Sequence, residues 1–290
     1  MIKIESIELH ISNHCNLCCR GCSHMTPLEE KGFINLEDTI NSLNILRKYV
    51  HCDVIRLLGG EPTLNPNLEN IVNEIRKTNI ADNISIPTNG ILLDRLSDNI
   101  LKKVDIIEVS NYNYSDIKAN KIIEWCKEKK DKFNNIKFYI YMYDSFREPC
   151  VIKKNRDEHL IKKIYDTCII AHKWQCFNVN NNYFFKCPEA MALCKNIDEL
   201  QIDENAIYIT DSDELEEKIK NYINSEKPLP TCSYCLGTTG KKFKIEQTTK
   251  EKYMDYVNKN IDELLDKNFL NKCIDNDIGD METVLETIEI

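Results

Sequence analysis

The sequence predicts an α/β fold in which strands and helices alternate around a parallel sheet. Between residues 4 and 143, short apolar runs typical of strands alternate with amphipathic segments that have helical spacing. Repeated strand–helix units of this length imply parallel strands with right-handed crossovers. About five or six such units fit into this region, which is fewer than the eight units of a closed barrel.

Each element is predicted from its own pattern. Residues 4–11 alternate apolar and polar side chains, which indicates a strand, and 53–58 is a buried strand that runs into two glycines. Asn35 is the expected N-cap of the first helix. The predicted strands span 4–11, 53–58, 83–87, 105–109 and 136–143, and the predicted helices span 35–50, 67–77, 92–103, 116–130, 157–167 and 250–269.

Composition and charge exclude several classes of function. The 290 residues carry a net charge of −9, with 42% hydrophobic and 29% charged residues, which is typical of a soluble globular protein. An acidic chain is a poor partner for nucleic acid. We find no apolar run long enough for a membrane span and no signal-peptide organisation at the first residues. Fourteen cysteines without a secretion signal favour metal binding in a reducing cytosol over disulfides.

A cysteine-rich loop directly follows the first predicted strand. Cys15, Cys19 and Cys22 have C-x3-C-x2-C spacing, and three thiolates leave one iron of a [4Fe-4S] cluster without a protein ligand. An open iron can bind a cofactor directly. Cys18 leaves an alternative open, a zinc knuckle held by all four cysteines of the loop. Otherwise Cys18 is expected as a small buried filler beneath the loop.

This loop resembles that of the radical S-adenosylmethionine (SAM) superfamily, and the resemblance implies a partial (β/α)6-type TIM barrel. It also implies roles for strand-end residues. Gly59-Gly60-Glu61-Pro62 would contact the SAM α-amino group, and the alternative is an ordinary strand-to-helix turn. Many family members have an aromatic residue just before the third cysteine, but here Gly21 stands there, so His24 or a backbone group is expected to replace it. The residues expected to line the SAM pocket, whose types also favour simple turns, are Thr88, Asn89, Ser110 and Asn111.

A second group of cysteines surrounds a predicted β-hairpin, in which 177–179 and 183–185 flank three asparagines. This pattern resembles the twitch domain, the short form of the SPASM domain, with Asn182 in place of the turn glycine. The resemblance implies a second, fully ligated [4Fe-4S] cluster. Cys176 is an alternative first ligand, and structural zinc is an alternative metal. The implied ligands are Cys168, Cys187, Cys232 and Cys235.

Three units are expected: a barrel at 1–165, an auxiliary-cluster domain at 166–245 and a helical extension at 246–290. The acidic tail at 275–290 has helix-like spacing at Met281, Val284 and Ile288. It is expected either to pack across the barrel opening or to form a solvated end.

By the resemblance, a reduced cluster cleaves SAM to a 5′-deoxyadenosyl radical that removes a hydrogen atom from substrate. The electron would come from an external reductant such as flavodoxin or ferredoxin. A closed second cluster fits electron transfer, so oxidation or epimerisation is expected. In an epimerisation a cysteine returns hydrogen, with Cys194 as the candidate donor and Cys52 and Cys150 as alternatives.

The expected substrate is a small molecule, since the first strand begins by Ile4 and leaves no room for a leader-binding domain. The Cys-Arg-Gly-Cys-Ser-His form of the loop at 19–24 resembles radical SAM enzymes of sugar and polysaccharide biosynthesis. A carbinol carbon of a sugar-like or aminocyclitol molecule is therefore expected. The rival is a ribosomally made peptide whose leader is bound by a separate protein. A more distant alternative is a non-enzymatic iron–sulfur or zinc protein.

Overall fold

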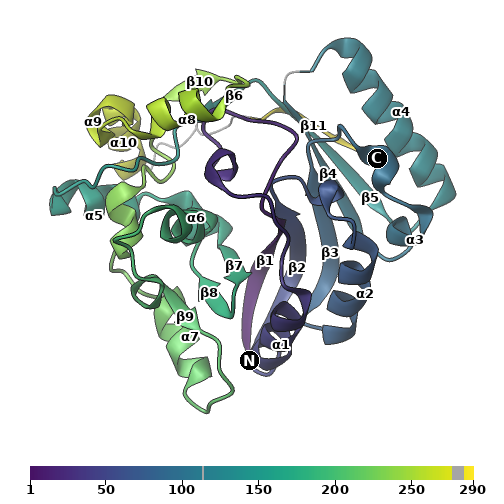
Figure 1. The fold of residues 1–290 in the computed structure, drawn as a ribbon, viewed down its shortest axis with the longest axis horizontal. Coiled ribbons are helices and arrows are strands. Elements are labelled where there is room, and N and C mark those ends of the chain that lie inside the picture. Colours follow the sequence, from purple (N-terminus) through teal and green to yellow (C-terminus); the bar gives the residue numbers. More distant parts are fainter. Residues whose placement is uncertain (113, 276–283) are drawn as a thin grey trace.

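The computed structural model describes residues 1–112, 114–275 and 284–290, and these fold around one curved sheet (Figure 1). Its nine strands have the order β11-β5-β4-β3-β2-β1-β7-β8-β9. Six neighbouring strands, β5 to β1 and then β7, run parallel. This confirms the predicted α/β class and the open, partial form of the barrel.

The strands of the main sheet are longer than predicted at several ends. The parallel strands are β1 (Ile2–Ser12), β2 (Val50–Gly59), β3 (Ala81–Thr88), β4 (Ile106–Tyr112), β5 (Lys137–Tyr143) and β7 (Cys176–Asn180). The antiparallel strands are β8 (Tyr183–Phe185), β9 (Ala206–Tyr208) and β11 (Val284–Glu289), and a separate two-stranded sheet consists of β6 (Ser145–Arg147) and β10 (Lys242–Lys244).

Helices α1 to α4 connect the first five strands and cover one face of the sheet (Figure 1). Asn35 caps α1 as predicted, because its side chain accepts a hydrogen bond from the backbone N–H of Asp38. The helices are α1 (Leu36–Leu46), α2 (Leu68–Thr78), α3 (Asp98–Leu101), α4 (Asp116–Lys132), α5 (Glu158–Asp166), α6 (Pro188–Asn196), α7 (Leu215–Ile223), α8 (Lys250–Val257), α9 (Ile261–Leu264) and α10 (Lys267–Ile274). In the part of the chain that is described, none of them is long and apolar enough to cross a membrane.

The predicted hairpin is confirmed and extends the main sheet. β7 and β8 pair antiparallel around Asn181 and Asn182, whose φ angles of 47° and 64° are left-handed. Asn182 thus adopts the conformation expected of the residue that replaces glycine. β7 also pairs parallel with β1, so the hairpin lies beside the strand that precedes the cysteine loop.

Two predicted helices differ in the structure. The helix expected at 250–269 is divided into α8, α9 and α10, because Asn260 and Asp266 each cap a new helix within the amphipathic pattern. The helix expected at 92–103 is reduced to α3, whose cap is Ser97. Helices α6 and α7 were not predicted.

The helix-like spacing of the acidic tail does not correspond to a helix in the described residues 284–290. Val284 and Ile288 lie in β11, which pairs antiparallel with β5 at the edge of the sheet. An open strand edge offers unpaired backbone groups, and pairing with it outweighs a weak helical pattern. Met281, the first residue of that pattern, lies outside the described residues.

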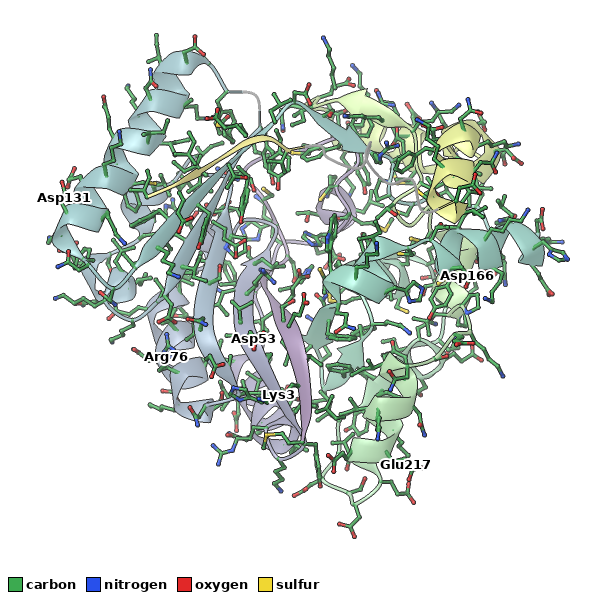
Figure 2. All side chains as sticks on the ribbon, turned by 180° about the vertical axis from the view of Figure 1, so that it is seen from behind. Lys3, Asp53, Arg76, Asp131, Asp166 and Glu217 are labelled. Carbon is green, nitrogen blue, oxygen red and sulfur yellow. The ribbon has the colours of Figure 1, made fainter. Side chains whose placement is uncertain are left out.

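Alternation along the strands gives the sheet one apolar and one polar face. On β4, Ile107 and Val109 are fully buried in the main hydrophobic core with the helices, whereas Glu108 and Ser110 line cavities on the other face. Figure 2 shows charged side chains of the covering helices, such as Arg76 and Asp131, at the periphery of the molecule. The concave face of the sheet is therefore the place for a polar site.

Candidate active site

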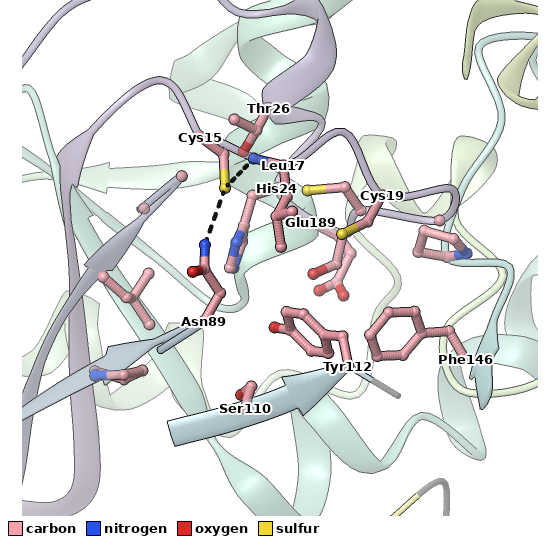
Figure 3. Close-up of a pocket in the computed structure, with 18 of the residues that line it drawn as sticks. Cys15, Leu17, Cys19, His24, Thr26, Asn89, Ser110, Tyr112, Phe146 and Glu189 are labelled. Carbon is pink, nitrogen blue, oxygen red and sulfur yellow. Dashed lines mark hydrogen bonds between the residues drawn. The ribbon is translucent and has the colours of Figure 1, made fainter. Parts of the chain in front are cut away.

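The three predicted cluster cysteines lie together in the loop after β1. Cys15, Cys19 and Cys22 all line a cavity of about 360 Å³ at the carboxyl ends of the strands (Figure 3). Burial raises the pKa of Cys15 to about 12 and that of Cys19 to about 11, and the neighbouring thiols add to both shifts. A cationic metal partner stabilises such thiolates, so the donor set fits an iron–sulfur cluster.

Cys18 differs from these three cysteines because it does not line the cavity. Like them it is partly exposed, so it is not buried beneath the loop as expected. Its backbone N–H donates to Oε1 of Gln247 at 3.0 Å, and Nε2 of Gln247 donates to Sγ of Cys19 at 3.1 Å. Gln247 therefore fixes the cysteine loop from a position 228 residues away, and no local pattern in the sequence indicates this contact.

The two glycines of the Gly-Gly-Glu-Pro turn let two backbone segments approach each other. A Cβ at Gly60 would lie 2.1 Å from the carbonyl oxygen of His14, and one at Gly59 would lie 2.3 Å from that of Ser12. The N–H groups of Gly60 and Glu61 donate to these same two carbonyls. The turn thus holds the start of the cysteine loop, and residues 59–61 line the cavity beside it.

The carboxylate of Glu61 is bound within the protein. It is 1% exposed, and Oε1 accepts hydrogen bonds from the backbone and hydroxyl of Thr63 and from the hydroxyl of Thr88. Oε2 accepts from the N–H of Asn89 at 2.9 Å. Glu61 therefore ties the end of β2 to the end of β3. Pro62 is buried behind it, at the start of a one-turn helix.

Three of the four predicted pocket residues line the cavity. They are Thr88, Asn89 and Ser110, and Asn89 Nδ2 also donates to Sγ of Cys15 at 3.7 Å (Figure 3). Asn111 lies outside the lining because it points to the opposite face of β4, where its Nδ2 donates to Sδ of Met142 and its Oδ1 accepts from the N–H of Tyr114. Consecutive residues of a strand point to opposite faces, so Ser110 and Asn111 do not share one pocket.

Aromatic side chains reach the cavity from other elements. Gly21 has a φ of +69°, and a Cβ there would lie 2.5 Å from Cζ of Phe243. Tyr112 and Phe146 both line the cavity near Cys19, with ring centroids 5.4 Å apart (Figure 3). His24 lines it as well. No local sequence pattern predicts that these two aromatic residues meet at the cavity, because Tyr112 ends β4 and Phe146 lies in β6, both distant along the chain from the cysteine loop.

The second predicted set of cysteines also comes together. Cys168, Cys187, Cys232 and Cys235 line one small cavity of about 30 Å³. Burial raises the pKa of all four thiols, to about 12 for Cys168 and about 11 for Cys232. Lys186 lines the same cavity; its buried Nζ donates to Oη of Tyr165 and to backbone carbonyls. Four thiols beside a buried cation are a suitable donor set for a second metal centre.

Two further cysteines lie apart from that set. Cys176 begins β7 and lines a different, polar cavity, not the one shared by the four cysteines. Cys194 packs against apolar residues, lines neither the cavity of the cysteine loop nor the polar cavity, and has its pKa raised to about 12 by burial.

The polar cavity lies within the curved sheet and has a volume of about 590 Å³. Arg56 Nε donates to Glu108 Oε1 at 3.2 Å within it. Burial raises the pKa of Glu8 to about 7, although a hydrogen bond from Asn178 opposes the shift. The cavity shares lining residues with that of the cysteine loop: Leu58, Pro87, Ser110 and Trp174.

One buried carboxyl group lies between the two cysteine sets. Glu189, at the start of α6, lines both the cavity of the cysteine loop and the four-cysteine cavity (Figure 3). It is 3% exposed, and burial raises its pKa to about 7. No sequence pattern distinguishes Glu189, because an acidic residue at the first turn of a helix is common without any function.

Comparison with known proteins gives a family for the first half of the chain. Residues 9–137 match the family model of the radical SAM superfamily. The chain is 33% identical over 100 residues to a probable GTP 3′,8-cyclase of Methanococcus vannielii and 31% identical over 134 residues to the GTP 3′,8-cyclase of Moorella thermoacetica. These matches cover 34% and 42% of this chain, and only 33% and 41% of those proteins.

Among solved structures, anSMEcpe with bound AdoMet matches with a TM-score of 0.50 at 14% identity, over 76% of this chain and 82% of that one. BtrN in complex with AdoMet and 2-DOIA matches with a TM-score of 0.47 at 14% identity, over 78% of this chain and 84% of that one. At such low identity the likeness to anSMEcpe concerns the fold alone. The family match over residues 9–137, together with the cavity lined by Cys15, Cys19 and Cys22, identifies this part of the chain as a radical SAM domain.

Proposed function

We propose that this chain is a radical SAM enzyme that oxidises or epimerises a carbinol carbon of a sugar-like or aminocyclitol small molecule. The observation that carries the proposal is the pair of adjoining cavities, one lined by the cysteine loop and one lined by polar side chains of the sheet. Radical chemistry needs a reactive group and a substrate held side by side and away from water. The proposed reaction takes place in a reducing cytosol, and the proposed electron donor is flavodoxin or ferredoxin.

Cys15, Cys19 and Cys22 would hold a [4Fe-4S] cluster, and SAM would lie against the ends of β2, β3 and β4. The backbone of 59–61 and the side chains of Asn89 and Ser110, which line the cavity, would orient it. Tyr112 and Phe146, which also line the cavity, would contact the adenine. When bound, the cluster and SAM supply the 5′-deoxyadenosyl radical that removes hydrogen from the substrate.

The charge of the polar cavity indicates the substrate class. Its ionisable carboxyl groups, Glu5, Glu8, Asp53 and Glu108, outnumber its one guanidinium, Arg56. Carboxylates accept hydrogen bonds from hydroxyl and ammonium groups and repel phosphates. An aminocyclitol or sugar fits this lining better than a nucleoside triphosphate, so the activity of the GTP 3′,8-cyclases is not proposed for this chain.

The four cysteines at 168, 187, 232 and 235 would hold a second [4Fe-4S] cluster within the unit at 166–245. Lys186 would stabilise the reduced form of that cluster, because a buried cation favours added negative charge. This arrangement suits removal of an electron from the substrate, and hence oxidation. In an epimerisation, Cys176 is better placed than Cys194 to return hydrogen, because Cys176 lines the polar cavity.

The metal content and the cleavage of SAM test the enzyme. Anaerobically reconstituted protein should contain about eight irons per chain and, once reduced by dithionite, should convert SAM to 5′-deoxyadenosine. The Cys19→Ser variant should lose about four irons and all cleavage, whereas the neighbouring Cys18→Ser variant should keep both. Full cleavage of SAM by Cys19→Ser would refute the assignment of the first cluster. A content of about four irons and one zinc per chain in the wild type would show that the second site holds zinc in place of a cluster.

The substrate class needs its own experiment. Sugars and aminocyclitols that carry deuterium at single carbinol carbons would be incubated with reduced enzyme and SAM. Transfer of deuterium into 5′-deoxyadenosine, detected by mass spectrometry, supports the proposal. Transfer from a deuterated peptide encoded beside the gene, with none from the small molecules, would support the peptide-modifying alternative instead.

A further inference from the structure

We propose that Glu8, His10 and His24 form a binding site for one divalent transition-metal ion, distinct from both cysteine sets. Each of the three residues offers one ligand atom, and these atoms all lie within 4.8 Å of one another. Neither the SAM site nor the four-cysteine site uses these residues as ligands.

The fold brings these three side chains together from two segments. Glu8 and His10 are two residues apart on β1, so both point to the concave face of the sheet. His24 returns from the far side of the cysteine loop, and its ring meets that of His10 edge to face at a centroid distance of 4.5 Å. The site therefore lies between β1, which carries Glu8 and His10, and the end of the cysteine loop, which carries His24.

His10 carries the observation that points to a ligand. Its side chain is 4% exposed, and its Nε2 has no hydrogen-bond partner among the described residues. Burial of a polar atom without a partner is unfavourable, so such an atom in a native protein needs an explanation. A metal ion held between His10, Glu8 and His24 supplies the missing partner.

Glu8 is already oriented as metal ligands are. Its Oε2 accepts a hydrogen bond from Asn178 Nδ2 at 3.1 Å. Protein ligands of metals are characteristically fixed in this way by a second hydrogen-bond partner. Lys195 adds an unfavourable positive charge near the two imidazoles.

The donor set indicates the class of metal. Two imidazoles and one carboxylate suit Zn²⁺, Fe²⁺ and Mn²⁺, whereas Ca²⁺ and Mg²⁺ prefer all-oxygen sites. Ligand atoms around a tetrahedral zinc lie roughly 3.4 Å apart, so these atoms, now within 4.8 Å of one another, would approach by up to about 1.4 Å when the ion binds. Three protein ligands leave coordination positions open. Because His24 lines the cavity of the cysteine loop, those positions are available to an oxygen atom of a bound molecule.

Mn²⁺ is a suitable probe because it favours nitrogen and oxygen ligands over thiolates. Cluster-loaded, oxidised protein would be titrated with MnCl2, and free Mn²⁺ would be followed by electron paramagnetic resonance. We expect one Mn²⁺ bound per chain and its displacement by one equivalent of Zn²⁺. The His10→Gln and His24→Gln variants should bind at least about tenfold more weakly. The control is His51→Gln, because His51 lies on β2 and pairs with Asp82 at 2.9 Å.

The iron content of each variant shows whether its clusters and fold are intact. If His10→Gln does not fold, Asn178→Leu serves in its place, and about tenfold weaker binding is again expected, since Asn178 orients Glu8. Equal Mn²⁺ binding by wild type and these variants overturns the proposal, as does wild-type protein that binds neither Mn²⁺ nor Zn²⁺ beyond its clusters. Cleavage of SAM is not the readout, so failure here is separate from failure of the proposed function.

Discussion

Gly60 shows how much of the site depends on a single missing methyl group. The backbone of His14 and Cys15 occupies the place that a Cβ at residue 60 would take, with three atoms within 2.8 Å. No rotamer change relieves a clash with backbone atoms. By the family resemblance this motif is expected to contact the SAM α-amino group, and in the structure the backbone that Gly60 approaches is that of the cysteine loop.

The Gly60→Ala variant should therefore displace the loop that carries Cys15. We expect loss of about half of the bound iron and destabilisation by about 2 kcal/mol or more. Iron per chain and unfolding in urea measure both effects. Gly32→Ala is the control, because its Cβ would meet only the tip of the Asn13 side chain, at 3.2 Å. Unchanged iron in Gly60→Ala would contradict this account.

Glu189 should make stability depend on pH. Its pKa is raised from 4.5 to about 7 by burial, so between these values the folded state binds more protons than the unfolded state. Stability from this group is therefore present below pH 4.5 and is lost as the pH rises to about 7. Glu189→Gln removes the dependence, and relative to the variant the wild type should lose about 3 kcal/mol across that range. The free energy of unfolding would be measured against pH for the cluster-free wild type and the cluster-free variant, and two parallel curves would refute this prediction.

Among the elements, the segment after β10 supports the cysteine loop, although no local pattern in its sequence indicates this. Residues 246–248 run alongside the cysteine loop: the N–H of Arg20 donates to the carbonyl of Glu246, and that of Thr248 donates to the carbonyl of Cys18. A bridge pairs Cys19 with Gln247. An irregular loop thus gains the regular support that a neighbouring strand gives in a sheet.

Gln247→Leu keeps the size of that side chain and removes its hydrogen bonds to the loop. The first cluster should be lost several times faster to a chelator, because Cys19 Sγ and the Cys18 N–H each lose a partner. The rate of loss of the iron–sulfur absorbance under bathophenanthroline measures this. Gln201→Leu, at an exposed site, should behave as the wild type does. Equal rates for all three proteins would show that Gln247 gives no support.

At the scale of the whole molecule, Arg20 joins the cysteine loop to the C-terminal half. Its guanidinium donates twice to Oε1 of Glu148 and lies between the rings of Phe243 and Tyr256, at 4.3 and 4.1 Å from their centroids. Glu148 is 3% exposed, so this ion pair is largely buried on the acidic side. Planar stacking and a forked donor are properties that lysine lacks.

Arg20→Met should destabilise the protein by about 3 kcal/mol, because it leaves the Glu148 carboxylate buried without its partner. Adding Glu148→Gln should recover part of the loss, which a double-mutant cycle in urea measures. Lys48→Met is the comparison, since Lys48 and Asp211 form a pair that is half exposed on both sides, and it should cost less than about 1 kcal/mol. A loss of that small size for Arg20→Met would contradict the role of Arg20 as a buried link.

The sequence by itself determined the parts of this protein that depend on local spacing. Ligand spacing within one loop predicts Cys15, Cys19 and Cys22 as cluster ligands, and apolar periodicity predicts the parallel sheet. Asparagines, which tolerate left-handed turns, predict the β7–β8 hairpin. Each of these signals lies within about a dozen residues, where chain geometry limits what can form.

Only the tertiary structure decided which distant segments meet. It placed Asn111 on the face of β4 opposite to the cavity and brought Gln247 to Cys19. It also divided the predicted C-terminal helix and paired β11 with β5. It also gathered Glu8, His10 and His24 at one point. Contacts between residues far apart in the chain are set by packing and by available sheet edges. These are properties of the assembled core, and no local pattern encodes them.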